Sequence, residues 1–364
     1  MSDSKPSYLQ IYDDLEGKIR RQQIPAGEML PSDSEISQTY GVSRPTVAKA
    51  LQLLSTDKLV LRKPGFGTQV LATRKTALLA GLLIPQFSET EIFRPICASL
   101  AETAGKEGMR VVRPTDLNEV DDLKKRTESL AEELIEARVR GVFFAPTEHV
   151  EEPEKFNLEI IERFHAEGIQ IVLLDRDVHR WPRQTPHELI SIDNVQAGCV
   201  VADHLLDQGC EHLAFVSKDN PATTVQLRRM GCREALIQRG MDPKNLEFVI
   251  HDAENPELSA NELLAKGVDG VVCANDATAS TFLRGLLDLG AKVPQDVKVC
   301  GFDNVTYAAL LSVPLTSYQQ PCHDIGRIAA EAMVRRITAP DSPFLRITLQ
   351  GELIVRESSV GGKE

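Results

Sequence analysis

The fold of the N-terminal part is decided by residues 29–71, MLPSDSEISQTYGVSRPTVAKALQLLSTDKLVLRKPGFGTQVL. Ser32, with a Glu three residues later, has the pattern of a capping box and predicts a helix start. Gly41 supplies a turn, and Ser43 is expected to begin a second helix. Two short β runs then flank a basic, glycine-containing turn within 59–71. Helix, turn, helix and hairpin in this order predict a winged helix-turn-helix.

The second helix has the features that a DNA-reading helix needs. The major groove of B-DNA is about 12 Å wide and admits one helix, whose N-terminal residues reach the base edges. Pro45 fits in the first turn, where its missing N–H costs nothing. An ordinary amphipathic surface helix is the alternative, but the turn and the wing favour DNA reading. The DNA-contacting residues predicted from this helix and from the basic turn after it are Ser43, Arg44, Pro45, Thr46, Lys49, Arg62 and Lys63.

Composition and charge distribution limit the kinds of protein this chain can be. With 364 residues, 42% of them hydrophobic, the chain is long enough for two or three domains. Residues 1–75 hold 11 Lys and Arg against 8 Asp and Glu, a net charge of +3, so the total of −12 leaves −15 for the remainder. The acidic body is expected to stay off DNA phosphates and leave contact to the basic module.

No signal-peptide core or long apolar stretch is present, so we expect a cytoplasmic protein without a membrane partner. The seven Cys residues form no C-x-x-C pair, which argues against a zinc site and a disulfide framework. Neither a metal nor a cofactor is therefore expected.

From residue 78 onward, strand-like apolar runs alternate with helical segments in two tandem series. Such alternation predicts parallel sheets covered by helices, here an α/β fold with two lobes. The predicted division is a DNA-binding domain at 1–71, a linker at 72–77 and a ligand-binding domain at 78–360. Lobe 1 is expected at about 78–176 and 305–318, and lobe 2 at about 189–303 and 321–360.

The motifs LPSDSEIS, YGVSRPTV, KALQLL and GFGTQV, within residues 6–71, resemble those of the GntR family of bacterial transcription regulators. This resemblance implies that Arg44 and Thr46 contact bases or phosphates. It also implies DNA contacts at Ser32 and Ser34, and that Gly65 and Gly67 let the wing approach the minor groove. The family often has Arg at the position of Ala48, so either operator preference differs or Lys49 supplies the charge.

Residues 78–360 resemble the LacI and periplasmic-binding-protein type of effector domain, through motifs such as IQIVLLDRDV, RRMGCREAL and VCGFDN. The resemblance implies two doubly wound parallel sheets that close on a small polar ligand. The ligand contacts carried over by motif are Asp175, Arg228, Asn275, Asp303 and Gln320, whose side chains suit sugar hydroxyls.

Each proposed ligand contact also has an ordinary structural explanation. Asp175 and Asp303 could cap hinge amides, Asn275 could form a turn, and Arg228 could be a salt bridge. Phe87 and Phe93 flank the first strand–helix loop, where a ligand ring could stack, although core packing explains Phe93 equally well. Trp181 could be a pocket lid or a surface-loop anchor.

Together these features predict a GntR-like reader joined to a LacI-like sensor, an architecture like that of AraR-type chimeric regulators. We expect a repressor that binds operator DNA as a homodimer and responds to a small sugar. A purine or nucleoside effector, or a co-repressed or activating regulator, remains an alternative. An enzyme is not expected, because no G-x-S-x-G, P-loop or H-E-x-x-H motif is present. A solute-binding transport protein would need a signal peptide and no winged helix.

Overall fold

The computed structural model describes residues 7–20, 23–63, 67–71, 78–85, 87, 91–114 and 122–360. Its contacts divide the chain into two compact units, Met1–Leu78 and Leu79–Glu364. The predicted linker at residues 72–77 lies outside the described residues.

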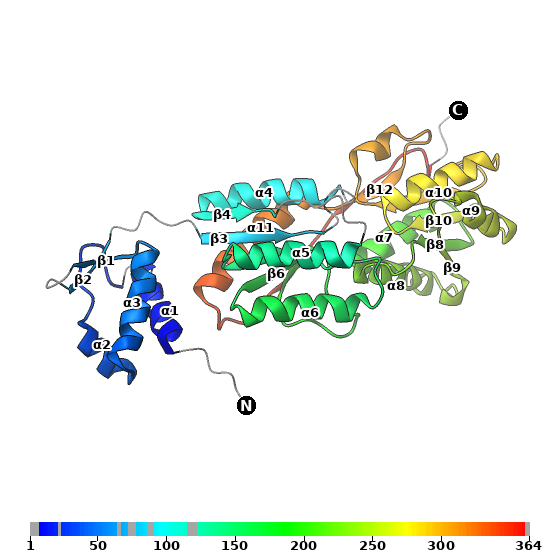
Figure 1. Ribbon diagram of the computed structural model, residues 1–364. Coiled ribbons are helices and arrows are strands. Elements are labelled where there is room, and N and C mark those ends of the chain that lie inside the picture. Colours follow the sequence, from blue (N-terminus) through cyan, green and yellow to red (C-terminus); the bar gives the residue numbers. More distant parts are fainter. Residues whose placement is uncertain are drawn as a thin grey trace. The chain divides into compact units, whose positions relative to one another are not determined.

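The first unit is a small helical domain with a β-hairpin (Figure 1). Its elements are α1 (Ser7–Arg20), α2 (Asp33–Tyr40), α3 (Arg44–Thr56), β1 (Val60–Lys63) and β2 (Gly67–Val70). Gly41 has φ 61° and donates its N–H to the Ser37 carbonyl, which ends α2 in the left-handed conformation that glycine tolerates. A core that includes Ile11, Ile36 and Leu51 joins the helices and the hairpin. The predicted winged helix-turn-helix is confirmed.

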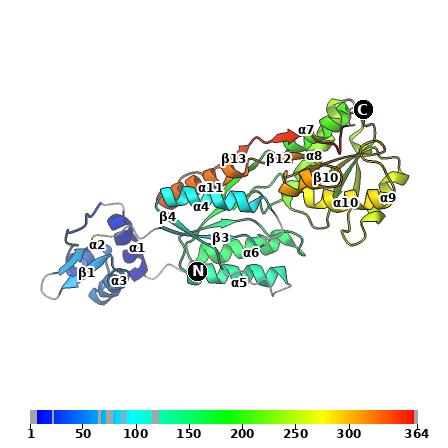
Figure 2. The same cartoon turned by 90° about the horizontal axis from the view of Figure 1, so that it is seen from above.

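The second unit contains two six-stranded sheets, which we call lobe 1 and lobe 2 with the helices that cover them (Figures 1 and 2). Lobe 1 has the strand order β13-β7-β6-β5-β3-β4, and its described strand pairs are parallel. Its strands are β3 (Leu78–Leu83), β4 (Met109–Val112), β5 (Gly141–Phe144), β6 (Gln170–Leu174), β7 (Glu188–Ile192) and β13 (Arg346–Leu349). Its helices are α4 (Phe93–Lys106), α5 (Leu123–Glu136), α6 (Pro153–Ala166) and α11 (Cys322–Thr338).

Lobe 2 has the strand order β14-β12-β11-β10-β8-β9, and only its β12–β14 pair is antiparallel among the strands described. Its strands are β8 (Leu213–Ser217), β9 (Glu247–Ile250), β10 (Gly270–Cys273), β11 (Lys298–Phe302), β12 (Thr316–Gln319) and β14 (Glu352–Ile354). Its helices are α7 (Asn194–Asp207), α8 (Thr223–Gln238), α9 (Pro256–Ala265) and α10 (Asp276–Asp288), with short 3₁₀ turns at Pro243–Asn245 and Thr306–Leu310.

The predicted lobe boundaries are wrong at three places. β7 pairs with β6 and so belongs to lobe 1, although residues from 189 onward were expected in lobe 2. β12 pairs with β11 in lobe 2, although 305–318 was expected in lobe 1. α11 and β13 return to lobe 1, although 321–360 was expected in lobe 2. The cause is that strands and helices alternate alike in both lobes, so periodicity does not show where the chain crosses between sheets.

In the described part of the chain, no helix is long and apolar enough to cross a membrane. Over the same residues, no three His, Cys, Asp or Glu side chains are grouped so that they could hold a metal ion.

Candidate functional site

The N-terminal end of α3 presents polar side chains to solvent. Ser43, Arg44 and Pro45 are exposed, while Val47 and Leu51 on the opposite side are buried in the core of the first unit. Ser43 is the N-cap but its side chain makes no cap hydrogen bond; its hydroxyl lies 2.8 Å from that of Thr46. Free helix amides and exposed side chains at this end suit phosphate and base contacts.

Arg44 is held in place by the helix before the turn. Its guanidinium donates to the Ser34 hydroxyl at 3.1 Å. Ser32, also predicted to contact DNA, is the N-cap of α2 and shares a capping box with Glu35, whose carboxylate accepts from the Ser32 N–H at 2.7 Å. Ser32 therefore stabilises α2, and Ser34 orients Arg44.

The wing carries two of the predicted cations. Arg62 forms an ion pair with Asp33 of α2, and Lys63 is exposed at the end of β1. Gly67 has φ 95°, a backbone conformation that favours glycine. Gly65 lies outside the described residues. The Arg62–Asp33 pair ties the wing to the helix-turn-helix.

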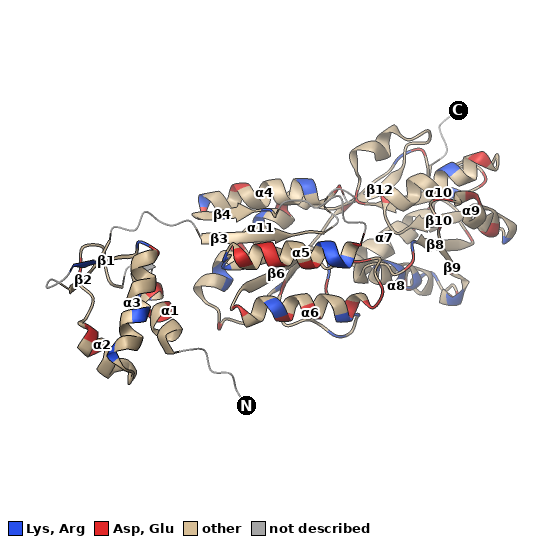
Figure 3. Cartoon of the chain, viewed as in Figure 1, with Lys and Arg blue, Asp and Glu red and all other residues tan. Residues whose placement is uncertain are grey.

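Lys49 occupies a different place from the other predicted DNA contacts. Its ammonium nitrogen lies 3.9 Å from the centre of the Tyr8 ring in α1, a cation–π distance. α3 and β1 carry basic residues and no acidic ones, α2 carries acidic residues and no basic ones, and α1 carries both (Figure 3). The positive charge available for DNA is therefore concentrated at the start of α3 and on the wing.

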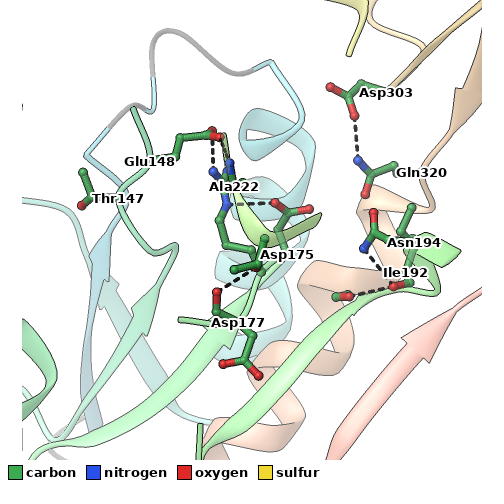
Figure 4. A network of polar contacts seen from close by, with 12 residues as sticks. Thr147, Glu148, Asp175, Asp177, Ile192, Asn194, Ala222, Asp303 and Gln320 are labelled. Atoms are coloured by element: carbon green, nitrogen blue, oxygen red, sulfur yellow. Dashed lines mark hydrogen bonds and ion pairs between the residues drawn. The ribbon is translucent and has the colours of Figure 1, made fainter. Parts of the chain in front are cut away.

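In the second unit, five side chains form what we call the inner polar cluster: Asp175, Arg176, Arg228, Asp303 and Gln320. Figure 4 labels three of them, Asp175, Asp303 and Gln320. The aspartates follow β6 and β11 at the carboxyl ends of those strands, the place where open α/β sheets bind ligands. Both have left-handed backbone conformations, with φ 66° for Asp175 and 102° for Asp303. Such strain in non-glycine residues is typical of functional sites.

On the lobe 2 side of this cluster, Arg228 makes polar contacts with three other residues. It donates to the Asn194 side-chain oxygen at 2.9 Å and to the Ala274 carbonyl at 2.7 Å. Its third nitrogen lies 3.7 Å from the Asp303 carboxylate. The Gln320 amide donates to the same carboxylate at 2.7 Å (Figure 4). The structure thus brings Arg228, Asp303 and Gln320 together.

Asp175 belongs to the lobe 1 side, where Arg176 donates to its Oδ2 at 3.0 Å and also pairs with Glu148. The ion pair between Glu148 and Arg176 stabilises the charged form of both side chains. Burial raises the pKa of Glu148, but Arg176, His149 and the Ala222 N–H together outweigh burial and leave it lowered. Burial lowers the pKa of Arg176, but the two carboxylates outweigh burial and leave it raised.

Two oxygen atoms of the inner polar cluster are buried without a hydrogen-bond partner among the described residues: Asp175 Oδ1 and Gln320 Oε1. Burial raises the pKa of Asp303, and the charge of Asp175 adds to this, although Arg228 and Gln320 oppose it. A buried acceptor without a donor costs about 1–3 kcal/mol. Hydroxyl donors from a ligand would satisfy these acceptors.

Hydrogen bonds among the described residues join the lobes near this cluster, including one from the His149 N–H to the Asn220 carbonyl at 2.9 Å. The Ala222 N–H donates to Glu148 at 3.0 Å, and the Thr223 hydroxyl donates to the Asp177 carbonyl at 2.9 Å. The His149 ring nitrogen Nδ1 donates to the Asp219 carbonyl at 2.8 Å. The lobes are therefore in contact across the cleft in this structure.

The remaining predicted ligand residues are not drawn into the cluster. Phe93 is 1% exposed and packs in the lobe 1 core, with the Arg176 guanidinium 5.7 Å from its ring centre. Phe87 lies under the guanidinium of Arg113, at 4.7 Å. The Asn275 side chain caps α10 by accepting from Thr278, which is the turn-forming alternative. Trp181 is 63% exposed.

Sequence reasoning missed Glu148, Arg176 and Asn194. Arg176 directly follows Asp175 in the motif LLDRDV, so the signal was present but was assigned to one residue. Glu148 and Asn194 carry no local pattern, because their role depends on where Arg176 and Arg228 point in space.

Comparisons with known proteins match both units. Residues 7–70 match the family described as "Bacterial regulatory proteins, gntR family". Residues 202–359 match the "Periplasmic binding protein-like domain".

The curated relatives are regulators of transcription. The arabinose metabolism transcriptional repressor of Geobacillus stearothermophilus is 26% identical over 97% of this chain and 98% of its own length. The ribose operon repressor of Halalkalibacterium halodurans is 24% identical over 79% of this chain and 82% of its own length.

Solved structures agree in fold. A LacI family transcriptional regulator from Enterococcus faecium with bound ribose superposes with a TM-score of 0.63 at 23% identity, covering 78% of this chain and all of that one. A cellobiose complex of the regulator CelR gives a TM-score of 0.64 at 22% identity, covering 90% of this chain and all of that one. The chain is therefore a transcription regulator rather than an enzyme, in which a gntR-family DNA-binding domain is joined to a LacI-like, periplasmic-binding-protein-like domain.

Proposed function

We propose that the chain is a cytoplasmic repressor that binds operator DNA as a homodimer and responds to a small sugar bound at the inner polar cluster. The observation that carries this proposal is the pair of buried acceptors without a partner among the described residues, Asp175 Oδ1 and Gln320 Oε1, in a cluster that also holds Arg228. A sugar offers adjacent hydroxyls that both donate and accept, which matches this mixture of groups.

The comparisons support the same ligand class. Two relatives are named for arabinose metabolism and the ribose operon, and two structural neighbours contain ribose and cellobiose. A purine or nucleoside is less well supported, because both ring faces that could stack on a base are engaged: Phe93 is buried with Arg176 over its ring, and Phe87 lies against Arg113.

The proposed mechanism uses the two lobes. A ligand that contacts Asp175 in lobe 1 and Asp303 in lobe 2 favours the closed arrangement of the lobes. The ligand changes the affinity of the protein for its operator only to the extent that the ligand itself binds the DNA-binding state and the released state with different affinities. A homodimer presents two copies of α3 to a pseudo-palindromic operator. The spacing of these two helices in the dimer therefore sets the affinity for DNA.

The first test is a thermal-shift screen of the full chain against pentoses, hexoses, disaccharides and nucleosides. A ligand present at 100 times its Kd is expected to stabilise the native state by about 2.7 kcal/mol. Calorimetry on the responding sugar should then show at least about a tenfold loss of affinity in Asp303→Asn, since one charged acceptor is lost.

Asp288→Asn is the matched control, because Asp288 is an exposed aspartate at the end of α10. We expect this variant to bind the sugar as the unaltered chain does. Equal weakening in both variants, or a response to nucleosides alone, would contradict the sugar proposal. Light scattering of the protein with palindromic DNA tests the dimer, and one protomer per operator would contradict it.

A further inference from the structure

A cavity of about 220 Å³ lies beside the loop that follows β8. Lobe 2 supplies most of its lining, from that loop, from the start of α8 and from the edge strand β9. Arg180, from the loop after β6, is the contribution of lobe 1. None of the five residues of the inner polar cluster lines this cavity.

The charged residues that line the cavity are mostly cations. Arg180, Lys218 and Arg229 face one acid, Asp219. Among the described residues, none of the three cationic groups has an ion-pair partner, whereas Arg176 and Arg228 are both paired with acids. The cavity therefore carries a local excess of positive charge within a chain whose net charge is −12.

Arg229 is positioned by an aromatic ring. Its guanidinium lies 4.4 Å from the centre of the Phe248 ring, which fixes the side chain against β9. Burial lowers the pKa of Arg229, and the like charge of Arg233 lowers it further. Both effects show that the positive charge of Arg229 lacks compensation.

The strand register explains the apolar wall. Phe248 pairs with Phe215 and Ile250 pairs with Ser217, so these side chains share one face of the sheet. Val249 points to the other face and into the lobe 2 core. Phe248 and Ile250 are 41% and 56% exposed. The cavity thus combines three cations with a partly open apolar wall.

We propose that this cavity binds a small phosphate monoester, with its dianionic group between Arg180, Lys218 and Arg229 and its carbon skeleton against Phe248 and Ile250. Guanidinium groups bind phosphate oxygens through paired, charge-assisted hydrogen bonds. Because Arg180 comes from lobe 1 and the other two cations from lobe 2, the anion bridges the lobes and stabilises their closed arrangement. This site is separate from the proposed sugar site and acts as a second input to the same lobe closure.

The test is calorimetric titration of the full chain with glycerol 3-phosphate and with inorganic phosphate, in a phosphate-free buffer of low ionic strength. We expect saturable binding of the ester, tighter than that of inorganic phosphate, because only the ester contacts the apolar wall. Arg229→Gln and Lys218→Gln should each weaken ester binding by about tenfold.

Arg110→Gln is the matched control, because Arg110 is an exposed arginine in β4 of lobe 1 that does not line the cavity. It should leave the ester affinity within about twofold, since its charge is exposed and belongs to a different part of the second unit. Thermal melting of each variant without ligand verifies that the fold is retained, and Lys218 is exposed, so its replacement should not disturb packing.

Three results would overturn the proposal: no saturable ester binding, equal weakening by Arg229→Gln and Arg110→Gln, or inorganic phosphate binding as tightly as the ester. Sugar binding measured in the same variants separates the two sites. Loss of ester binding with unchanged sugar binding supports a separate anion site. If the chain binds the ester but binds no sugar, the proposed sugar response is contradicted and the proposed anion site is not.

Discussion

Asp276, the first residue of α10, is a buried carboxyl group that links the strands of lobe 2. It accepts from the Ser317 hydroxyl at 2.7 Å and from the Val305 N–H at 3.0 Å. Burial raises its pKa to about 8, and the nearby Asp303 adds to the increase. The group therefore holds a proton in the folded chain at pH values where the unfolded chain has lost it.

The free energy of unfolding is expected to reflect this proton. Because the folded state binds more protons between pH 3.8 and about 8, the contribution of Asp276 is largest below the unfolded pKa and is lost as the pH rises through the folded pKa. Urea unfolding of the chain and of Asp276→Asn across this range should show the unaltered chain losing stability relative to the variant as pH rises. Parallel pH profiles would contradict the protonated state of Asp276.

Operator affinity should depend unequally on the two cations of α3. Arg44 is exposed at the helix start, so Arg44→Ala should weaken operator binding by about tenfold or more, as expected for a lost base or phosphate contact. Lys49 is held over the Tyr8 ring, so Lys49→Ala should change affinity by no more than about twofold beyond the general charge effect. Fluorescence anisotropy on one operator measures both, and a larger loss for Lys49→Ala would show that the side chain leaves Tyr8 to contact DNA.

At the scale of elements, the crossing of α7 and α8 holds Arg228 in position. A Cβ placed on Gly198 of α7 would lie 2.0 Å from the Arg228 carbonyl oxygen, and one on Gly231 of α8 would lie 2.0 Å from that of Val195. The two helix backbones are thus in direct contact, and only glycine at both positions permits this approach. Arg228 reaches Asp303 from this fixed base.

Gly231→Ala is therefore expected to destabilise the second unit by about 3 kcal/mol, since the added methyl group meets backbone rather than a flexible side chain. Gly105→Ala is the control, because Gly105 is in α4 and has no atom within 4 Å of an added Cβ. Its replacement should be neutral or slightly stabilising, as alanine favours helix. Denaturant unfolding of both variants gives the comparison, and equal stabilities would refute the close packing of α7 on α8.

The elements themselves were largely predictable, because each follows from local signals. The capping box at Ser32, the turn at Gly41 and the helix start at Ser43 lie where residue chemistry places them. The lobe membership of β7 and α11 was not predictable, since it depends on pairing with strands and helices far away in the sequence. In the candidate site, Asp175, Arg228, Asp303 and Gln320 were found by motif. Asn275 turned out to cap α10 because its side-chain oxygen also suits that local role.

At the scale of the whole molecule, the N-terminal DNA-binding domain is basic and the remainder of the chain is acidic. The first 75 residues carry +3 and the remainder −15, so contact with DNA phosphates depends on the small reader. In the proposed homodimer, two DNA-binding domains on one operator would bind more strongly than one, because the first contact raises the effective concentration of the second. A ligand-binding domain that alters their spacing would then control DNA affinity without touching DNA.

The most direct test of this account is the affinity of the full chain for a palindromic operator, measured by fluorescence anisotropy with and without the sugar identified by thermal shift. We predict that saturating sugar changes operator affinity by about tenfold, a coupling free energy of about 1.4 kcal/mol. We also predict that Asp303→Asn keeps the affinity of the sugar-free chain but loses the response. A sugar that binds at the inner polar cluster yet leaves operator affinity unchanged would contradict the account.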